Sequence, residues 1–499
     1  MPEPPSDEAG DDRPRLLAEL GRLERASRPL DPGTSRRRRL RTAAVASSER
    51  LLRRVGSLRA YVESKDKGAG LLDAPIGPRG LGLDRVFELL EREVVTPGAN
   101  PASPGHLAYI PGGGLYHAAL GDFLAAVSNK YAGVFFAGPG AVRMENMLVR
   151  WVADLVGFPT GAAGTILSGG SLATLAAVCA ARDAHGITGR DAGHAVVYLT
   201  TQAHHCVPKA LRIAGLAEVT LRSVPTDARH RMMPEALAEA IAADRAAGLR
   251  PWLVIAAAGT TDTGTVDPLD ALGSVAARER CWFHVDAAYG GFFLLTEHGR
   301  RVLAGIERAD SVVLDPHKGL FLPYGSGIVV VRDAPTLLAA HHYEGAYMQD
   351  ALSEPTELSP SELSPELSRH FRGLRMWLPL ILLGTAPFQA ALDEKLLLAR
   401  YFRQEAAALG FEVGPEPDLS IVTFRRVPVG LPPERVDALN RAIVQGVRRD
   451  GRVFLSSTML DGRFTIRLVV LAFRTHRRTV DLALRVLREQ TAAAEAGLA

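Results

Sequence analysis

The sequence contains few residues that could do amine chemistry. Its 58 basic side chains comprise six lysines (65, 67, 130, 209, 318 and 395), and all the others are arginines. Lys318 stands out because it follows an apolar segment and precedes a loop rich in Gly and Pro, in SVVLDPHKGLFLPYGSG. Desolvation at a strand end can hold a lysine partly neutral, and a neutral amine can form a Schiff base. The alternative is an ordinary surface lysine, but this chain almost always uses arginine where it needs only positive charge.

A carboxylate lies 32 residues earlier, at Asp286 in WFHVDAAYGG. It ends an apolar segment, and the C-terminal edge of a parallel sheet faces the crevice where such proteins bind ligands. There it could hold the protonated nitrogen of a pyridine ring, while Ala287 and Ala288 let a flat ring approach the backbone. The alternative role for Asp286 is to cap a turn.

An anion site is indicated at residues 168–171, in TILSGGSLATLAAVCAAR. A short strand leads into Ser-Gly-Gly-Ser, and a helix follows. Exposed N–H groups and the helix dipole both favour a phosphate at such a helix start. The segment lacks the Gly-Lys-Ser/Thr of a Walker loop, and a simple turn with a helix cap remains the alternative.

Two more segments place polar groups after strands: His204 and His205 in TQAHHCVPKA, and Thr260 and Thr261 in AAAGTTDTGTVDPL. An imidazole could stack on an aromatic ring, and a threonine hydroxyl could donate to a ring substituent. A lone histidine is more often structural. Taken together, however, the phosphate turn, the ring stacker, the ring-nitrogen acid and the Schiff-base lysine predict a site for pyridoxal 5'-phosphate.

The elements that must position these groups alternate in kind. Apolar segments at 195–200, 252–257, 282–286, 311–315 and 327–332 are mostly separated by segments of helical length. This order predicts an α/β architecture with a sheet covered on both faces. The last hundred residues predict a small α+β lobe with strands at 419–425, 453–458 and 463–470. Spacing of Leu83, Val86, Phe87, Leu90 and Val94 predicts an amphipathic helix.

Composition excludes several classes of function. A net charge of +3 argues against a general nucleic-acid binder. Three cysteines without metal-ligand spacing predict neither a metal site nor a disulfide scaffold and favour a reducing, cytoplasmic location. No apolar run is long enough to span a membrane. The arginine run at 36–39 is interpreted as a solvated helical face or a subunit interface rather than an anion-binding arm.

From about residue 84 to the C-terminus, the chain resembles the pyridoxal-phosphate-dependent group II amino-acid decarboxylases, which include aromatic-L-amino-acid and glutamate decarboxylases. The motifs that carry the resemblance are His317-Lys318, HVDAAY at 284–289, Gln-Ala-His at 202–204, Gly170-Ser171 and the Gly-Thr-Thr segment at 259–261. The segments FRGLRMW (371–377) and FTIRLVVLAFRTH (464–476) are also similar.

The resemblance implies a type I, aspartate-aminotransferase-like fold and a homodimer with active sites at the subunit interface. The implied divisions are an N-terminal segment 1–105, a cofactor-binding domain 106–384 and a small domain 385–499. Lys318, Asp286 and His204 become the catalytic residues, and His204 rather than His205 stacks on the ring. The implied cofactor contacts are Gly170, Ser171, His204, Thr261, Asp286, Ala288, His317 and Lys318. HLAYIPG (106–112) and GVFFAGP (133–139) imply substrate contacts at Tyr109, Phe135 and Phe136.

Two departures from the family pattern concern the reaction itself. Residues 344–368 carry six acids and no Lys or Arg, and they are predicted to be a mobile lid rather than a linker. Family decarboxylases usually have a lid tyrosine that reprotonates the substrate carbon, but LSPSELSPEL (358–367) has none, and the nearest are Tyr343 and Tyr347. Asp315 stands where many relatives have Asn near the phosphate, and its charge would repel the phosphate unless it is turned away or protonated.

The predicted reaction is decarboxylation of an L-amino acid to the amine and carbon dioxide. Phe135 and Phe136 favour an aromatic or bulky apolar substrate. The missing lid tyrosine leaves open an oxygen-dependent conversion to an aldehyde, because loss of that tyrosine accompanies such chemistry in relatives. Another lyase or aminotransferase reaction with the same cofactor, or a catalytically silent scaffold, is a further alternative.

Overall fold

The computed structural model describes residues 12–342 and 357–497. The chain forms two compact units, one from residues 1–56 and 66–96 and one from residues 57–65 and 97–499. No helix in the described ranges is both long and apolar enough to cross a membrane.

The smaller unit is helical. It contains α1 (Arg13–Ser27), α2 (Thr34–Arg54) and α3 (Leu83–Leu89), and α3 continues as a π-helical turn over Leu90–Val95. The predicted amphipathic helix at 83–94 is therefore present, with its second half wound as a π-helix. The arginine run at 36–39 lies exposed on α2.

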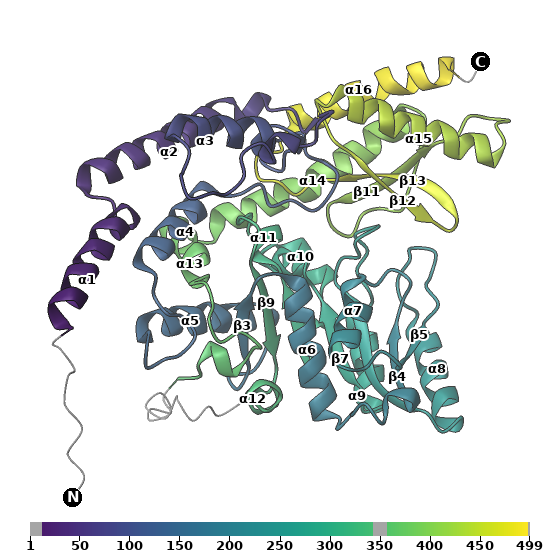
Figure 1. The fold of residues 1–499 in the computed structure, drawn as a ribbon. Helices are drawn as coiled ribbons and strands as arrows, with labels where there is room; N and C mark the ends of the chain where they lie inside the picture. The colour runs from purple at the N-terminus through teal and green to yellow at the C-terminus, as the bar shows by residue number, and fades with distance from the viewer. Residues whose placement is uncertain (1–11, 343–356, 498–499) are drawn as a thin grey trace, which may run out of the picture. The chain divides into compact units, whose positions relative to one another are not determined.

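A seven-stranded sheet dominates the larger unit (Figure 1). Its strands are β3 (Ala163–Leu167), β9 (Gly327–Val331), β8 (Ser311–Leu314), β7 (Trp282–Asp286), β6 (Arg250–Ala257), β4 (Ala195–Leu199) and β5 (Thr220–Ser223), in that spatial order. Only β9 runs antiparallel to its neighbours. The carboxyl ends of the other six strands therefore meet at one edge of the sheet.

Helices cover both faces of this sheet, as the continuous apolar strands require. One face packs against α5 (Pro139–Val156), α8 (Pro234–Ala246), α9 (Leu269–Arg278) and part of α14 (Ala386–Ala408). The other face packs against α6 (Gly170–Ala184), α7 (Cys206–Ile213) and α12 (Ala334–His341). The remaining helices of this part are α4 (Tyr116–Ser128), α10 (Glu297–Val302), α11 (Pro316–Gly319) and α13 (Gly373–Leu383).

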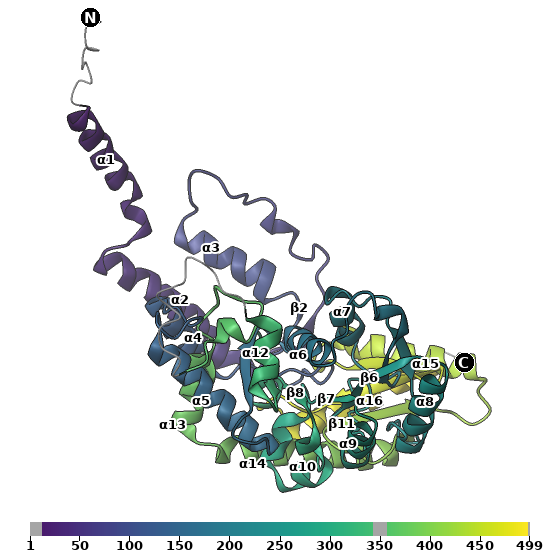
Figure 2. The same cartoon turned by 90° about the horizontal axis from the view of Figure 1, so that it is seen from below.

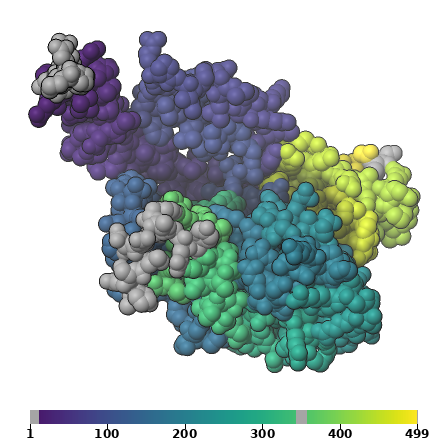
Figure 3. All heavy atoms as spheres, turned by 60° about the horizontal axis from the view of Figure 1, so that its bottom comes forward, coloured from purple at the N-terminus to yellow at the C-terminus, as the bar shows by residue number. Residues whose placement is uncertain are grey.

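The C-terminal part forms a second, antiparallel sheet in the order β10 (Phe411–Val413), β11 (Ile421–Arg426), β13 (Arg463–Val469), β12 (Ser456–Leu460). Helices α14, α15 (Pro433–Asp450) and α16 (Arg477–Ala496) pack on it around Phe402, Phe424 and Ile443 (Figure 2). In the space-filling view, the yellow-green surface of this C-terminal part borders the teal surface of the part that contains the large sheet (Figure 3). A two-residue ladder of β1 (Tyr61–Val62) and β2 (Gly98–Ala99) completes the larger unit.

The predicted α/β class and the small C-terminal α+β lobe are confirmed. The eight strands predicted by range are present, with shifted ends at all but 282–286, and so is the short strand predicted before residue 168. Four strands escaped prediction. β1 and β2 have two residues each, β5 is four residues long and alternates between half-buried and exposed positions at the sheet edge, and β10 has only three residues. Such short edge strands carry too little apolar patterning to be recognised.

The predicted lid at 344–368 is described only from residue 357 onward, and Tyr343 and Tyr347 lie outside the described residues. Residues 360–362 form a 3-10 turn closed by a capping box between Ser359 and Glu362. Ser359 Oγ also accepts a hydrogen bond from the backbone N–H of Phe135 at 3.1 Å. The described end of this segment is thus fixed to the larger unit.

A buried ion pair anchors the chain just after that segment. Arg369 Nη2 lies 2.8 Å from Glu145 Oε1, and both side chains are almost fully buried. Glu145 Oε1 also accepts from Thr165 Oγ1 and the N–H of Ile166, both in β3. The network therefore joins α5 and residue 369 to the strand that leads into the predicted phosphate turn.

Replacing Arg369 by Met should strongly destabilise the protein, because it leaves the Glu145 carboxylate buried without its cation. We expect a loss of about 3–5 kcal/mol in unfolding free energy, measured by urea denaturation. Arg301→Met is the matched control, since Arg301 pairs with Glu297 on an exposed helix surface, and should cost about 0–0.5 kcal/mol. Equal effects of the two substitutions would contradict the anchoring role.

Candidate active site

A cavity of about 450 Å³ opens at the edge where the carboxyl ends of the parallel strands meet. All eight residues predicted to contact the cofactor line it: Gly170, Ser171, His204, Thr261, Asp286, Ala288, His317 and Lys318. They come from segments that follow β3, β4, β6, β7 and β8. The sheet thus brings together residues that are as much as 148 positions apart in the sequence.

The turn between β3 and α6 forms one end of the cavity. Ser168, Gly169, Gly170 and Ser171 line it, and α6 begins at Gly170 with its N-terminus at the cavity. A Cβ atom on Gly170 would lie 2.9 Å from Asp315 Oδ2, and one on Gly327 would lie 2.4 Å from the carbonyl carbon of Gly169. A side chain at position 327 would collide with the backbone of Gly169, and one at position 170 would crowd the buried Asp315 carboxylate, so both glycines allow the segments to meet here.

Asp286 is the last residue of β7 and faces the cavity. Its Oδ1 accepts a hydrogen bond from the N–H of Ala288 at 3.1 Å, which fixes the carboxylate over the following turn. Ala288 is nearly buried and also lines the cavity. This geometry suits the predicted pairing of Asp286 with a ring nitrogen.

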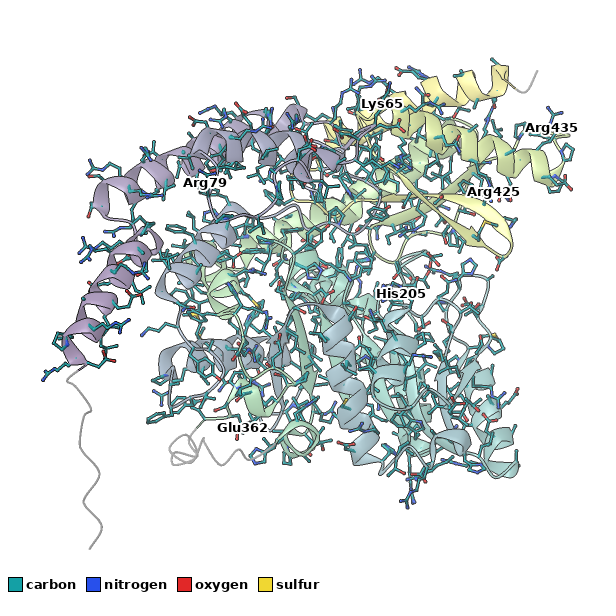
Figure 4. The ribbon with its side chains drawn as sticks, viewed as in Figure 1. Lys65, Arg79, His205, Glu362, Arg425 and Arg435 are labelled. Atoms are coloured by element: carbon teal, nitrogen blue, oxygen red, sulfur yellow. The ribbon has the colours of Figure 1, made fainter. Side chains whose placement is uncertain are left out.

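His204 lines the cavity, whereas His205 is exposed (Figure 4). The N–H of Cys206 donates to His204 Nδ1 at 3.2 Å, so this nitrogen carries no proton and Nε2 does. Burial lowers the pKa of His204, against the opposing effect of the Asp286 carboxylate. A neutral imidazole with an Nε2 proton is therefore presented to the site.

Lys318 forms an ion pair that the sequence did not predict. Its Nζ lies 3.0 Å from Asp315 Oδ2, and the Asp315 side chain is only 3% exposed. Burial lowers the pKa of Lys318, but Asp315 and Asp286 outweigh it and raise the pKa above its ordinary value. The expectation that desolvation would hold the amine partly neutral is therefore wrong, because a carboxylate lies beside it.

His317 lines the cavity, and its ring also contacts the next loop. Its Nδ1 contacts the carbonyl oxygen of Ser326 and must be the donor, since a carbonyl only accepts. Its Nε2 lies 3.7 Å from Asp315 Oδ2, and burial lowers the pKa of the ring. His317 is thus neutral and holds the loop after Lys318 in place.

Thr261 is held by an arginine from the second sheet. Arg467 in β13 donates to the carbonyl oxygens of Thr261 and Asp262, the latter at 2.7 Å, and to Ser456 Oγ at 2.9 Å. The guanidinium is 5% exposed, and burial lowers its pKa. Arg467 cannot be recognised as a site residue from the sequence, because the Thr261 loop that it holds lies more than 200 positions away.

The three predicted substrate contacts do not line the cavity within one chain. Tyr109 is 57% exposed and Phe136 is 64% exposed, while Phe135 is buried under the guanidinium of Arg143. Conversely, Ile110, Cys206, Tyr289 and Tyr324 line the cavity without having been predicted. Tyr324 could have been found from the sequence, because it lies in the loop with Gly and Pro that follows Lys318.

The residues present fit pyridoxal 5'-phosphate. The cavity is lined by a helix N-terminus with glycines, by the Asp286 carboxylate, by the His204 imidazole and by the Lys318 amine. These are the anion site, ring-nitrogen partner, stacking group and carbonyl-reactive amine that this cofactor requires. The fold and the site therefore define an enzyme that uses pyridoxal phosphate.

Comparison with known proteins agrees with this class. Residues 72–427 match the pyridoxal-dependent decarboxylase conserved domain. An aromatic-L-amino-acid decarboxylase from Bacillus atrophaeus is 35% identical over 85% of this chain and 88% of its own length. A phenylacetaldehyde synthase from Arabidopsis thaliana is 30% identical over 82% of this chain and 86% of its own length.

The fold is shared as well. The crystal structure of Oryza sativa TDC with PLP and tryptamine superimposes with a TM-score of 0.87 at 28% identity, covering 93% of this chain and 99% of that one. The chain belongs to the pyridoxal-dependent decarboxylase family. It is a pyridoxal-phosphate-dependent carboxy-lyase with the type I fold of these enzymes, acting on amino acids.

Replacing Lys318 by Ala should abolish the covalent link to the cofactor while leaving the fold intact. We expect no cofactor to remain attached to the protein after borohydride reduction and denaturation, with an unchanged circular dichroism spectrum. Lys209→Ala is the control, since Lys209 is exposed on α7, and should retain the link. A reducible protein-bound cofactor in the Lys318 variant would overturn the assignment.

Proposed function

We propose that this chain decarboxylates an aromatic L-amino acid and releases the amine. The observation that carries the proposal is the meeting of Lys318, Asp286 and the phosphate turn in one cavity. The aromatic substrate class is supported by the relatives, several of which are named as tryptophan, tyrosine or aromatic-amino-acid decarboxylases. Ile110, Tyr289 and Tyr324 add apolar and aromatic surface to the cavity.

Each residue has a role that follows from its place. When bound, pyridoxal 5'-phosphate supplies an electron sink for the electron pair left by the departing carboxylate. Asp286 keeps a proton on the ring nitrogen, and the N-terminus of α6 with Ser171 binds the phosphate. Lys318 would supply the amine that holds the cofactor and that the substrate amine displaces.

The remaining residues would contact the pyridine ring of the cofactor or supply the proton that replaces carbon dioxide on the substrate carbon. His204 would pack on the ring, and it is one of the described cavity residues that carry a proton for return to the substrate carbon. Thr261 and Ala288 border the ring, and His317 fixes the Lys318 loop. Water must be excluded for this chemistry, which is the role of the lid proposed over residues 344–368.

We infer that the active enzyme is a homodimer. Helices α4 and α13 pack together and expose a broad apolar surface, which on a single chain is unusual and typical of an interface. Its exposed members are Tyr116, Leu120, Phe123, Leu124, Val127, Ile381 and Leu382. Tyr109 and Phe136 are exposed and available to the partner's site, which explains why they do not line the cavity of their own chain, whereas Phe135 is buried within its own chain.

We also propose limits for the domains of this chain and a cellular location. We propose a segment 1–105, a cofactor-binding domain 106–384 that holds the seven-stranded sheet, and a small domain 385–499 that holds the antiparallel sheet. Cys179, Cys206 and Cys281 are free thiols, which supports the reducing environment of the cytoplasm.

A second candidate is oxygen-dependent conversion of the amino acid to an aldehyde. It is favoured by the absence of tyrosine from residues 357–368 and by the similarity to a phenylacetaldehyde synthase. The same cavity residues would serve, because the two reactions differ only after carbon dioxide has left.

Incubating a panel of amino acids with the protein and pyridoxal phosphate, and analysing the products, tests both candidate reactions. We expect equal amounts of carbon dioxide and amine, without oxygen uptake, and higher kcat/KM for tryptophan, tyrosine and phenylalanine than for glutamate. Leucine is the control for size without aromaticity. Release of aldehyde, ammonia and peroxide with oxygen uptake would establish the second candidate, and no carbon dioxide from any aromatic substrate would refute the proposal.

A further inference from the structure

Asp315 is a buried carboxylate that the proposed chemistry does not use. It follows β8 and lies beneath the phosphate turn, with its Oδ2 and Oδ1 2.9 and 3.2 Å from where a Cβ on Gly170 would be. Its side chain is 3% exposed, and Oδ1 has no hydrogen-bond partner among the described residues. A buried, half-satisfied carboxylate beside a phosphate site is costly, since two negative charges repel in a medium of low dielectric.

The only cation at hydrogen-bonding distance from this carboxylate, within the described ranges, is Lys318. The amine must lose a proton before it can react with an aldehyde. In the structure Asp315 works against this, because it helps to raise the pKa of Lys318 despite burial. One ion pair therefore creates two problems for cofactor binding: a protonated amine and a charged carboxylate under the phosphate.

One proton transfer solves both problems. We propose that the proton on Lys318 Nζ moves across the 3.0 Å contact to Asp315 when the phosphate enters the turn at residues 168–171. Asp315 then keeps this proton while the cofactor is bound. This inference rests on the proposed function of the cavity. The ammonium and carboxylate become amine and carboxylic acid, with no change in total charge or proton number.

The products of this transfer suit the next step. The free electron pair of Lys318 can add to the cofactor aldehyde carbon, whose oxygen leaves as water. The neutral carboxyl group of Asp315 no longer repels the phosphate and gains an O–H that can donate to it. A neutral carboxyl group can stay beside the phosphate, which explains how an aspartate is tolerated there.

Other titratable groups act on this pair, namely Asp286, His204, Cys206, His317 and Tyr324. None replaces Asp315 as the acceptor. His317 already donates from Nδ1 to Ser326 and has only its Nε2 near the pair, at 3.7 Å from Asp315. Burial raises the pKa of the Cys206 thiol to about 12, so that it keeps its own proton. Asp286 is committed to the ring nitrogen.

Proton uptake on ligand binding tests the proposal directly. The probe is pyridoxine 5'-phosphate, which has the phosphate but no aldehyde, and the method is calorimetry near pH 8 in buffers of different ionisation enthalpy. In Lys318→Ala the internal donor is gone, so Asp315 must take its proton from solvent, and we expect uptake of about one proton per ligand. In Lys318→Ala/Asp315→Asn we expect no uptake by this site.

Cofactor-free wild-type protein should also show no net uptake, because Lys318 supplies the proton internally. Equal uptake by the single and double variants would overturn the proposal. Failure of all forms to bind the probe would instead refute the phosphate turn, and with it the proposed function. Circular dichroism spectra of each variant control for folding.

The kinetics of cofactor rebinding give a second test. In wild type the proton stays within the pair, so the rate of reconstitution with pyridoxal phosphate should be nearly independent of pH. In Asp315→Asn the amine must lose its proton to solvent, and the rate relative to wild type should rise about tenfold per pH unit below the pKa of the amine. If both rates rose with pH and the wild-type curve lay at higher pH, Asp315 would be only a counter-ion.

Discussion

The site depends on the close approach of three backbone segments: the turn after β3, the turn after β8 and the start of β9. Gly170 and Gly327 permit this approach, since a Cβ on either would collide with its neighbours. The approach places the Asp315 carboxylate directly beneath the helix N-terminus that suits a phosphate, and it places Lys318 beside that carboxylate. The predicted phosphate turn and Lys318 therefore lie against the same buried carboxylate.

Strand direction explains why the other residues converge. Six of the seven strands run in one direction, so the segments that follow β3, β4, β6, β7 and β8 all begin at the same edge of the sheet. The second sheet supports that edge through Arg467, which holds the Thr261 loop, and through Tyr289, whose hydroxyl contacts Ser420 Oγ at 2.7 Å. A change in the small domain can thus alter the cavity without touching it.

The main strands and several cavity residues could be predicted, because the signals for them lie within short stretches of sequence. Apolar runs identified the main strands, and residues at their ends, such as Asp286 and Lys318, carried the chemistry. What could not be predicted depends on contacts distant in sequence: the pairing of Asp315 with Lys318, the role of Arg467, and Tyr324 in the cavity wall. Scarcity of lysine was a guide rather than proof, because Lys395 is fully buried without lying at the cavity, and its Nζ binds Glu394 at 2.7 Å and the carbonyl oxygen of Thr475.

We propose that Lys318, one lysine of six, carries the cofactor. Borohydride reduction of the wild-type holoenzyme, followed by proteolysis and mass spectrometry of every lysine-containing peptide, tests this assignment. We expect a pyridoxyl group on Lys318 and on no other lysine. A pyridoxyl group on Lys209, Lys395 or any other lysine, with Lys318 unmodified, would contradict it.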